Sequence, residues 1–234
     1  ANAPKLKRIG FFNDNTRDAI KGDAFHQRET GFISGNLKAK ESVKFGIAGA
    51  VYHQGIDYTK VNYSGFAWAG YAWHCINYAA AHDNLALYDK LKVSRPDLQE
   101  LDYIKMANLA GAIVLTAQGI PFFMLGTEMM RSKKGENNSY NLPDEINQID
   151  WSLKSRYQQV FNYHKGLIAL RKAHPAFRMV LPDEIRKNLV FYPTPDWVIA
   201  FSLNDHANGD PWKTIFVVFN AGIGPESVAL PADG

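Results

Sequence analysis

The stretch SRPDLQELDYIKMANLAGAIVLTAQGIPFFML, residues 94–125, decides the fold, because a periodic segment leads directly into a short apolar run. Apolar residues recur every three or four positions over residues 94–118, which predicts a helix. Ser94 and Asp97 form a capping-box pattern at its start, and Pro96 is tolerated in a first turn. Gly119 would end the helix, and residues 120–125 predict a buried strand. A helix followed at once by a strand is typical of a parallel β/α unit.

The same alternation extends toward both ends of the chain. Residues 8–12 (RIGFF) and 75–81 (CINYAAA) predict buried strands, and residues 41–52 and 156–174 predict helices. After these, the pattern changes to β-rich runs separated by Pro, Asp, Asn and Gly. The runs are residues 188–193, 196–203 and 213–220. We therefore expect an α/β fold with parallel strands, followed by an all-β segment, with the boundary near residues 182–187.

Long polar segments follow the predicted parallel strands, and one of them begins abruptly. The run INYAAAHDN, residues 76–84, ends in His82, Asp83 and Asn84. In a β/α barrel the loops after the strands carry the chemistry, so these three side chains are candidates for an active site. A lone His-Asp pair at a strand end also occurs as a purely structural feature.

Three β/α units do not close a barrel, which needs eight. An open three-stranded parallel sheet would leave two unpaired edges, which proteins avoid. We therefore expect the C-terminal part of a (β/α)8 TIM barrel in residues 1–185, comprising about its last three units. Residues 186–234 would begin an all-β C-terminal domain, a β-sandwich, and the chain would be a piece of a larger protein.

Composition narrows the classes of partner. The 234 residues are 46% hydrophobic and 21% charged, with a formal net charge of +3, and no Lys/Arg stripe is present that would bind nucleic acid. No apolar run is long enough to span a membrane. Cys75 is the only cysteine, so neither an intramolecular disulfide nor a cysteine zinc site is expected. The single cysteine fits a secreted or a cytoplasmic bacterial location, with a slight preference for secretion.

Three segments, in order along the chain, resemble those of one enzyme family. They are GFFNDNTRDAIKGD (residues 10–23), INYAAAHDN (residues 76–84) and GTEMMRSKKGENNSYNLPDEINQIDW (residues 126–151). Together they resemble the type I pullulanases, debranching enzymes of the α-amylase superfamily (glycoside hydrolase family 13). The resemblance implies hydrolysis of α-1,6-glucosidic linkages in pullulan, amylopectin and limit dextrins, with retention of configuration.

A retaining glycosidase needs a nucleophilic carboxylate and an acid/base carboxylate about 5 Å apart. The resemblance implies that both lie on earlier barrel strands, outside this chain, so that the chain alone would be inactive. Asp83 would be the third carboxylate, a transition-state stabiliser that binds hydroxyls of the sugar at the cleaved bond, and His82 would donate to a neighbouring hydroxyl. Expected partners are the α-glucan and the N-terminal remainder of the same enzyme.

Further substrate contacts are expected in the loops after the strands. Asn84 would be a sugar contact or a loop cap, and Asn13 and Asp14 would line the pocket. Arg17 and Asp18 would also line it, or would form an internal ion pair that shapes the loop. Arg131, Asn138, Tyr140 and Asp144 would contact sugars or belong to a self-hydrogen-bonded loop.

The sequence also supports expectations for Glu128, for metals and cofactors, and for alternative functions. Glu128 follows a predicted strand and is interpreted as structural. No His/Asp/Glu cluster has metal spacing and no cofactor is expected to be required, but calcium occurs in some members of the family. Alternative functions are an isoamylase-like or glycogen-debranching hydrolase and a non-catalytic glucan-binding fragment.

Overall fold

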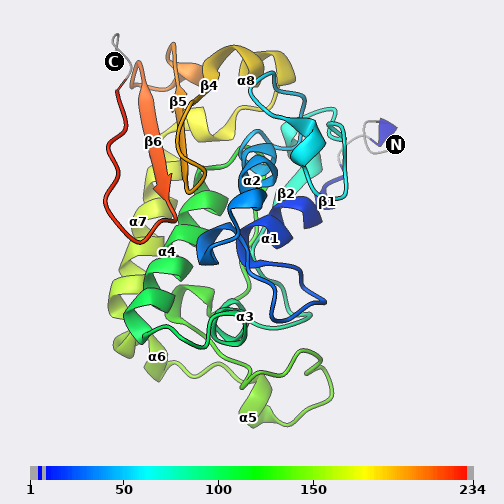
Figure 1. Cartoon of the computed structure of the whole chain (residues 1–234), viewed down its shortest axis with the longest axis vertical. Coiled ribbons are helices and arrows are strands. Elements are labelled where there is room, and N and C mark those ends of the chain that lie inside the picture. The colour runs from blue at the N-terminus through cyan, green and yellow to red at the C-terminus, as the bar shows by residue number, and fades with distance from the viewer. Residues whose placement is uncertain (1–4, 7–8, 231–234) are drawn as a thin grey trace.

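A computed structural model describes residues 5–6 and 9–230 of the chain (Figure 1). The helices are α1 (Asp14–Lys21), α2 (Lys40–Ile47), α3 (Leu87–Ser94), α4 (Glu100–Thr116), α5 (Asp144–Asn147), α6 (Ser152–Arg156), α7 (Gln158–Ala173) and α8 (Pro182–Asn188). The strands are β1 (Phe11–Phe12), β2 (Cys75–Asn77), β3 (Ile120–Pro121), β4 (Leu189–Tyr192), β5 (Val198–Leu203) and β6 (Ile215–Asn220). Short 3-10 helices are Phe32–Ser34, Leu37–Ala39, Tyr58–Lys60, Ala72–His74, Thr127–Met129, Pro175–Arg178 and Ala207–Gly209.

The first sheet is parallel and has the strand order β1-β2-β3. Phe11 pairs with Cys75, and Ile76 pairs with Ile120, so β2 is the middle strand, as the β/α alternation predicts. The strands are shorter than predicted, and Arg8 of the first predicted strand lies outside the described residues. The carbonyls of Ile76 and Asn77 accept the last sheet hydrogen bonds, so residues 78–81 form a loop rather than a strand.

The second sheet is antiparallel, with the order β4-β5-β6, and confirms the three predicted β-rich runs. Every residue of β5 is buried, and the ring of Phe201 packs against those of Phe191 and Phe219. In Figure 1 this sheet lies at the end of the molecule opposite α5. Helix α8 covers the expected boundary region, and the division at residues 185/186 stays a prediction.

The long helix predicted over residues 94–118 is wrong in its first part. Ser94 is the last residue of α3, and α4 begins at Glu100. Pro96 disfavours helical geometry in the residue before it, and Arg95 has φ −136° and ψ 67°. The first turn of α4 is instead capped by the Asp102 carboxylate, which accepts the amide of Gln99 at 3.2 Å.

The helix predicted over residues 41–52 also ends early, at Ile47. Gly49 and Ala50 both have positive φ, 71° and 58°, and such left-handed geometry does not continue a helix. The helix predicted over residues 156–174 is confirmed as α7, apart from its first two residues and its last.

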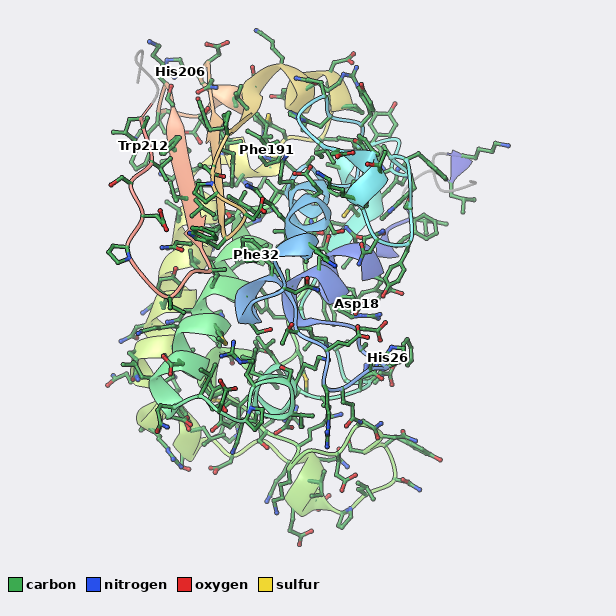
Figure 2. All side chains as sticks on the ribbon, viewed as in Figure 1. Asp18, His26, Phe32, Phe191, His206 and Trp212 are labelled. Carbon is green, nitrogen blue, oxygen red and sulfur yellow. The ribbon has the colours of Figure 1, made fainter. Side chains whose placement is uncertain are left out.

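Helices α4 and α7 pack against each other and contribute to the hydrophobic core. Gly111 of α4 allows the ring of His164 in α7 to approach the helix backbone. The guanidinium of Arg171 donates to the carbonyls of Leu115 and Ala117, which lie at the end of α4. Figure 2 shows Phe32 inside the molecule and His26 at its edge. Among the described residues, no helix combines the length and the apolar character needed to cross a membrane.

Candidate functional site

His82, Asp83 and Asn84 lie in the loop just beyond the carboxyl end of the middle parallel strand. They line a cavity of about 600 Å³. The remaining lining residues are Phe12, Arg17, Lys21, Phe25, Tyr78, Ala81, Phe122, Asn137 and Asn138. The side chains of His82 and Asp83 are 87% and 79% exposed, and Nε2 of the first lies 3.5 Å from Oδ1 of the second. The carboxylate is therefore open to a ligand from solvent.

The wall contributed by α1 carries a network of charges. The Arg17 guanidinium donates to both carboxylate oxygens of Asp18, at 2.6 and 2.9 Å, so the ion pair expected from the sequence is present. The same guanidinium donates to Asp14 at 2.9 Å, and the hydroxyl of Tyr78 also donates to Asp14, at 2.6 Å. This network holds Asp14 in a fixed position and leaves its side chain about half exposed.

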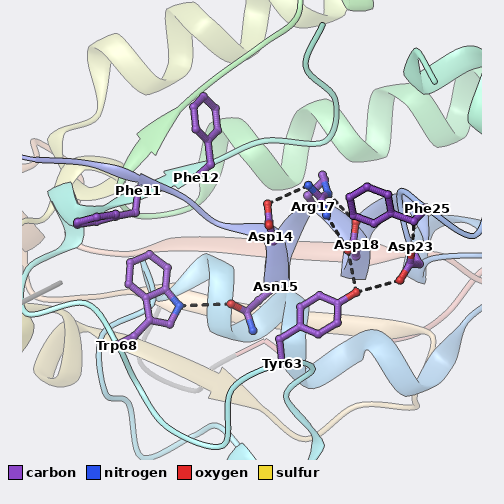
Figure 3. A pocket seen from close by; sticks show the side chains of 10 residues that line it. All are labelled: Phe11, Phe12, Asp14, Asn15, Arg17, Asp18, Asp23, Phe25, Tyr63 and Trp68. Atoms are coloured by element: carbon purple, nitrogen blue, oxygen red, sulfur yellow. Dashed lines mark hydrogen bonds and ion pairs between the residues drawn. The ribbon is translucent and has the colours of Figure 1, made fainter. Parts of the chain in front are cut away.

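A second cavity of about 560 Å³ adjoins the first (Figure 3). Phe12, Arg17 and Phe25 line both cavities, and Asp14 lines only the second. Trp68 and Tyr63 form part of the wall; the indole donates to Asn15 at 3.3 Å. Aromatic faces beside carboxylates suit sugars, which have apolar faces and polar edges.

The loop after β3 supplies the other side of the site. Arg131, Asn138 and Tyr140 line a cavity of about 320 Å³ together with His82 and Asp83. Three of the four loop residues expected to contact sugars are thus brought together with the His-Asp pair. The fourth, Asp144, begins α5 and lies outside the three cavities described here.

Hydrogen bonds within that loop fit the alternative expectation as well. The Arg131 guanidinium donates to the carbonyl of Asn147 at 2.6 Å, and the Asn147 amide donates to the carbonyls of Ser139 and Leu142. Glu128, interpreted as structural from the sequence, accepts the amide of Gly126 with its carboxylate at 3.0 Å.

Asn13 is a correction to the expected site. Its side chain is fully buried and caps α1 by accepting the amide of Thr16. Its amide group donates to the Thr16 hydroxyl at 2.6 Å and to the Asn77 side chain at 3.1 Å. A side chain satisfied by these internal partners is out of reach of a sugar in the cavity.

Sequence reasoning missed three buried residues that hold the loops of the site. Lys90 Nζ donates to the carbonyls of Asp23, His26 and Gln27, in the loop after α1. Asp89 and Lys133 connect α3 to the loop after β3. Their partners are distant in the sequence, and the only local signal is a charged side chain beside a candidate loop.

One cluster of possible metal ligands exists among the described residues, made of Asp23, His26 and Glu29, whose ligand atoms lie within 4.8 Å of one another. Asp23 already accepts the amides of Phe25 and His26, and the nearby main-chain carbonyls are taken by Lys90. Calcium prefers six to eight oxygen ligands, including carbonyls. The cluster therefore does not fit calcium.

Comparison with solved structures gives the decisive observation. A pullulanase variant of Paenibacillus barengoltzii complexed with maltotetraose matches 100% of this chain and 35% of that chain, with a TM-score of 0.91 and 45% sequence identity. The chain belongs to the pullulanase family. The pullulanase of Bacillus subtilis strain 168 is 39% identical over 235 residues, which cover all of this chain and 31% of that protein. A family model described as "Pullulanase, all-beta domain" matches residues 185–234 of this chain.

More distant relatives include enzymes named isoamylase, such as that of a Flavobacterium species, which is 26% identical over 205 residues and matches 69% of this chain and 26% of its own length. The chain spans about a third of the length of the pullulanase from Bacillus subtilis and of that from Paenibacillus barengoltzii.

Proposed function

We propose that this chain acts as part of a pullulanase that hydrolyses α-1,6-glucosidic linkages in pullulan, amylopectin and limit dextrins with retention of configuration. One observation carries the proposal. His82, Asp83 and Asn84 open into a cavity at the carboxyl end of a parallel strand. The chain that carries them is 45% identical to a pullulanase whose structure was solved with maltotetraose.

The architecture follows from the same proposal. Residues 1–185 would be the last β/α units of a (β/α)8 barrel, and residues 186–234 the start of a C-terminal β-sandwich domain. The parallel order β1-β2-β3 supports the first part. The antiparallel sheet β4-β5-β6 and the family match over residues 185–234 support the second.

Asp83 would act on the transition state. An ionised carboxylate is a strong, charge-assisted acceptor for sugar hydroxyls, and such bonds accelerate hydrolysis when they tighten as the sugar ring distorts. His82 would donate to a neighbouring hydroxyl. The nucleophile and the acid/base carboxylate would come from the rest of the enzyme, since the pullulanase of Bacillus subtilis is about three times as long as this chain.

The substrate contacts proposed around this centre are Asn84, Asp14, Arg131, Asn138, Tyr140 and Asp144. All except Asp144 line one of the three cavities. Tyr140 is largely exposed and would offer a ring face to a glucose unit. We propose that no cofactor is required and that any calcium in the enzyme lies away from this site.

The proposed role of Asp83 is tested by the substitution Asp83→Asn in the whole enzyme. The variant keeps the shape of the side chain and loses the charge, so kcat on pullulan should fall by at least about a thousandfold, while KM changes little. Glu136→Gln, in the loop after β3, is the matched control and should keep full activity. Activity of Asp83→Asn within about threefold of wild type would contradict the role given to Asp83.

An isoamylase-like specificity is the second candidate, favoured by the matches to isoamylases. Pullulan and glycogen separate the two, because each enzyme class would prefer a different branch environment. A purified enzyme that debranches glycogen at least ten times faster than it cleaves pullulan would favour the isoamylase-like candidate. Glucan binding without any release of reducing ends would favour a non-catalytic binding fragment.

A further inference from the structure

Lys133 contacts the peptide bond that links His82 to Asp83. Its Nζ donates to the carbonyl oxygen of His82 at 2.9 Å. The residue as a whole is only 1% exposed, whereas the side chains of His82 and Asp83 are exposed. A hydrogen bond from a charged donor to a carbonyl fixes the plane of that peptide, and with it the direction in which the next side chain leaves the backbone.

Lys133 is itself fixed from the other side. Its main-chain amide donates to Oδ2 of Asp89 at 2.7 Å, and the hydroxyl of Ser132 donates to Oδ1 of the same carboxylate at 2.5 Å. Asp89 is buried in the first turn of α3, the helix that follows Asn84. The loop after β3 therefore contacts the chain on both sides of Asp83. The Lys133 side chain binds the carbonyl of His82, which precedes Asp83, and the loop backbone binds Asp89, which follows it.

Charge supports the same arrangement. Burial lowers the pKa of Lys133, and the positive charge of Arg131 lowers it further, while the negative charges of Asp89 and Asp83 raise it. A buried ammonium is costly unless it is paired and hydrogen-bonded. Here it is placed among the carboxylates of the site, so its position serves the local charge balance as well as the backbone contact.

The same loop carries other residues of the site. Asn137 and Asn138 follow Lys133 and line the cavity together with His82 and Asp83. Movement of the loop relative to α3 would separate these amide side chains from the carboxylate. We infer that Lys133 is a positioning residue for the proposed glucan hydrolysis, fixing the peptide that carries Asp83 and holding the Asn137–Asn138 wall beside it.

This inference rests on the proposed function, and Lys133→Met in the enzyme as its gene encodes it is the first test. The matched control is Lys134→Met, which removes a neighbouring exposed lysine. Misplacement of a group that acts on the transition state lowers kcat, so Lys133→Met should lose at least about tenfold in kcat on pullulan, with KM within about threefold. Lys134→Met should match wild type in both constants.

A purely structural role would give a different result. Lys133→Met would then have a lower melting temperature but normal kcat per folded enzyme well below that temperature, and this outcome would overturn the inference. If Lys133→Met yields no folded protein, Ser132→Ala decides, since it removes one bond to Asp89 and keeps the ammonium. A fall in kcat of at least about twofold at unchanged KM supports the inference, and unchanged kcat overturns it.

Hydrogen exchange distinguishes loss of the contact between Lys133 and His82 from failure of the proposed function. If the wild-type enzyme does not hydrolyse pullulan, the proposed function fails, but the effect of Lys133 on the backbone around Asp83 can still be measured. Amides of residues 83–86 should then exchange at least about tenfold faster in Lys133→Met, or in Ser132→Ala if the first variant is not folded, than in Lys134→Met. Equal exchange rates would overturn the inference regardless of activity.

Discussion

The imidazole of His174 and the carboxylate of Asp210 meet in the interior, where Nδ1 and Oδ1 lie 3.0 Å apart. His174 follows α7 directly, whereas Asp210 lies between β5 and β6. The carboxylate also accepts the amides of Ala176 and Trp212, at 3.1 and 2.9 Å. One buried side chain therefore joins the helical part of the chain to the antiparallel sheet.

Asp210→Asn is expected to destabilise the protein. The asparagine side chain keeps the size of the carboxylate but offers one acceptor oxygen where two are used, so a buried donor loses its partner. Such a loss costs about 1–3 kcal/mol in the free energy of unfolding. Chemical denaturation measures it, and Asp205→Asn, at an exposed position in the same connection, should change stability by less than about 0.5 kcal/mol. Equal effects of both substitutions would show that the buried contacts of Asp210 contribute nothing.

The same carboxylate predicts a dependence on pH. Burial alone would raise the pKa of Asp210, but hydrogen bonds from His174, Trp212 and Ala176 outweigh it, so the pKa is lowered. A lowered carboxyl pKa gives stability that is present above the unfolded value of about 3.9 and is lost as pH falls through the folded value. The stability difference between wild type and Asp210→Asn should therefore shrink as pH falls below about 4. A difference that persists unchanged to pH 2 would contradict this assignment.

Gly111→Ala should disrupt the contact between α4 and α7. A methyl group at this position would lie 2.4 Å from Nε2 of His164 and 2.9 Å from Cδ2, closer than side-chain atoms approach. We expect a loss of about 1–3 kcal/mol, the usual cost of overpacking. Gly166→Ala is the matched control, because Gly166 lies in α7 with open space around it. It should gain about 0.5–1 kcal/mol from the higher helix propensity of alanine. Thermal unfolding of both variants checks the opposite signs.

The order of the elements could be predicted from the sequence because it depends on local patterns. Helix α7 and the three antiparallel strands follow from periodicity within single segments. The boundary of α4 could not be predicted correctly, because a capping pattern at Ser94 competed with the restriction that Pro96 places on Arg95. Short-range rules gave no way to weigh these two effects.

The residues of the candidate site likewise fall into those that local sequence patterns predict and those that only tertiary packing places. His82 and Asp83 could be placed at a cavity from the sequence because a polar run follows an apolar one, and their role stays a prediction. Asn13 was misjudged, since burial of its side chain depends on packing between β1, β2 and α1. Lys133 was missed, because its partner His82 lies about fifty residues away and no spacing rule connects them.

Lys21 is expected to reduce stability rather than add to it. Burial lowers the pKa of Lys21 to about 7, and the positive charges of Arg17, Lys90 and Lys133 act in the same direction, against Asp18. An unfolded lysine titrates near 10.4, so the unfolded chain binds more protons between pH 7 and 10, and stability rises with pH across that window.

Lys21→Met should therefore be more stable than wild type at pH 6, by about 1 kcal/mol or more, and the difference should shrink as pH rises toward 10. Urea denaturation at several pH values measures both trends. Lys38→Met, at an exposed position, should show neither. A Lys21→Met variant that is less stable than wild type at pH 6 would mean that the ammonium is stabilised by contacts that outweigh its burial.

The 234-residue chain by itself is expected not to hydrolyse pullulan. Family resemblance implies that the nucleophile and the acid/base carboxylate belong to other parts of the enzyme, and Asp83 would lie beside sugar hydroxyls rather than under the anomeric carbon. Phe12 and Ile120, on the outer strands of the parallel sheet, are 50% and 43% exposed, so the free chain should also tend to aggregate through this surface.

The assay is the release of reducing ends from pullulan by purified soluble chain, with the enzyme as its gene encodes it as the positive control. We expect no release by the chain, whether or not Asp83 is replaced by asparagine. Mixing the chain with the separately produced remainder of the enzyme should restore activity, if the two parts close one barrel. Turnover of about one per second by the pure chain, abolished by Asp83→Asn, would place the whole catalytic apparatus within these residues. The barrel would then have to be completed by a second copy of the chain rather than by another part of the enzyme.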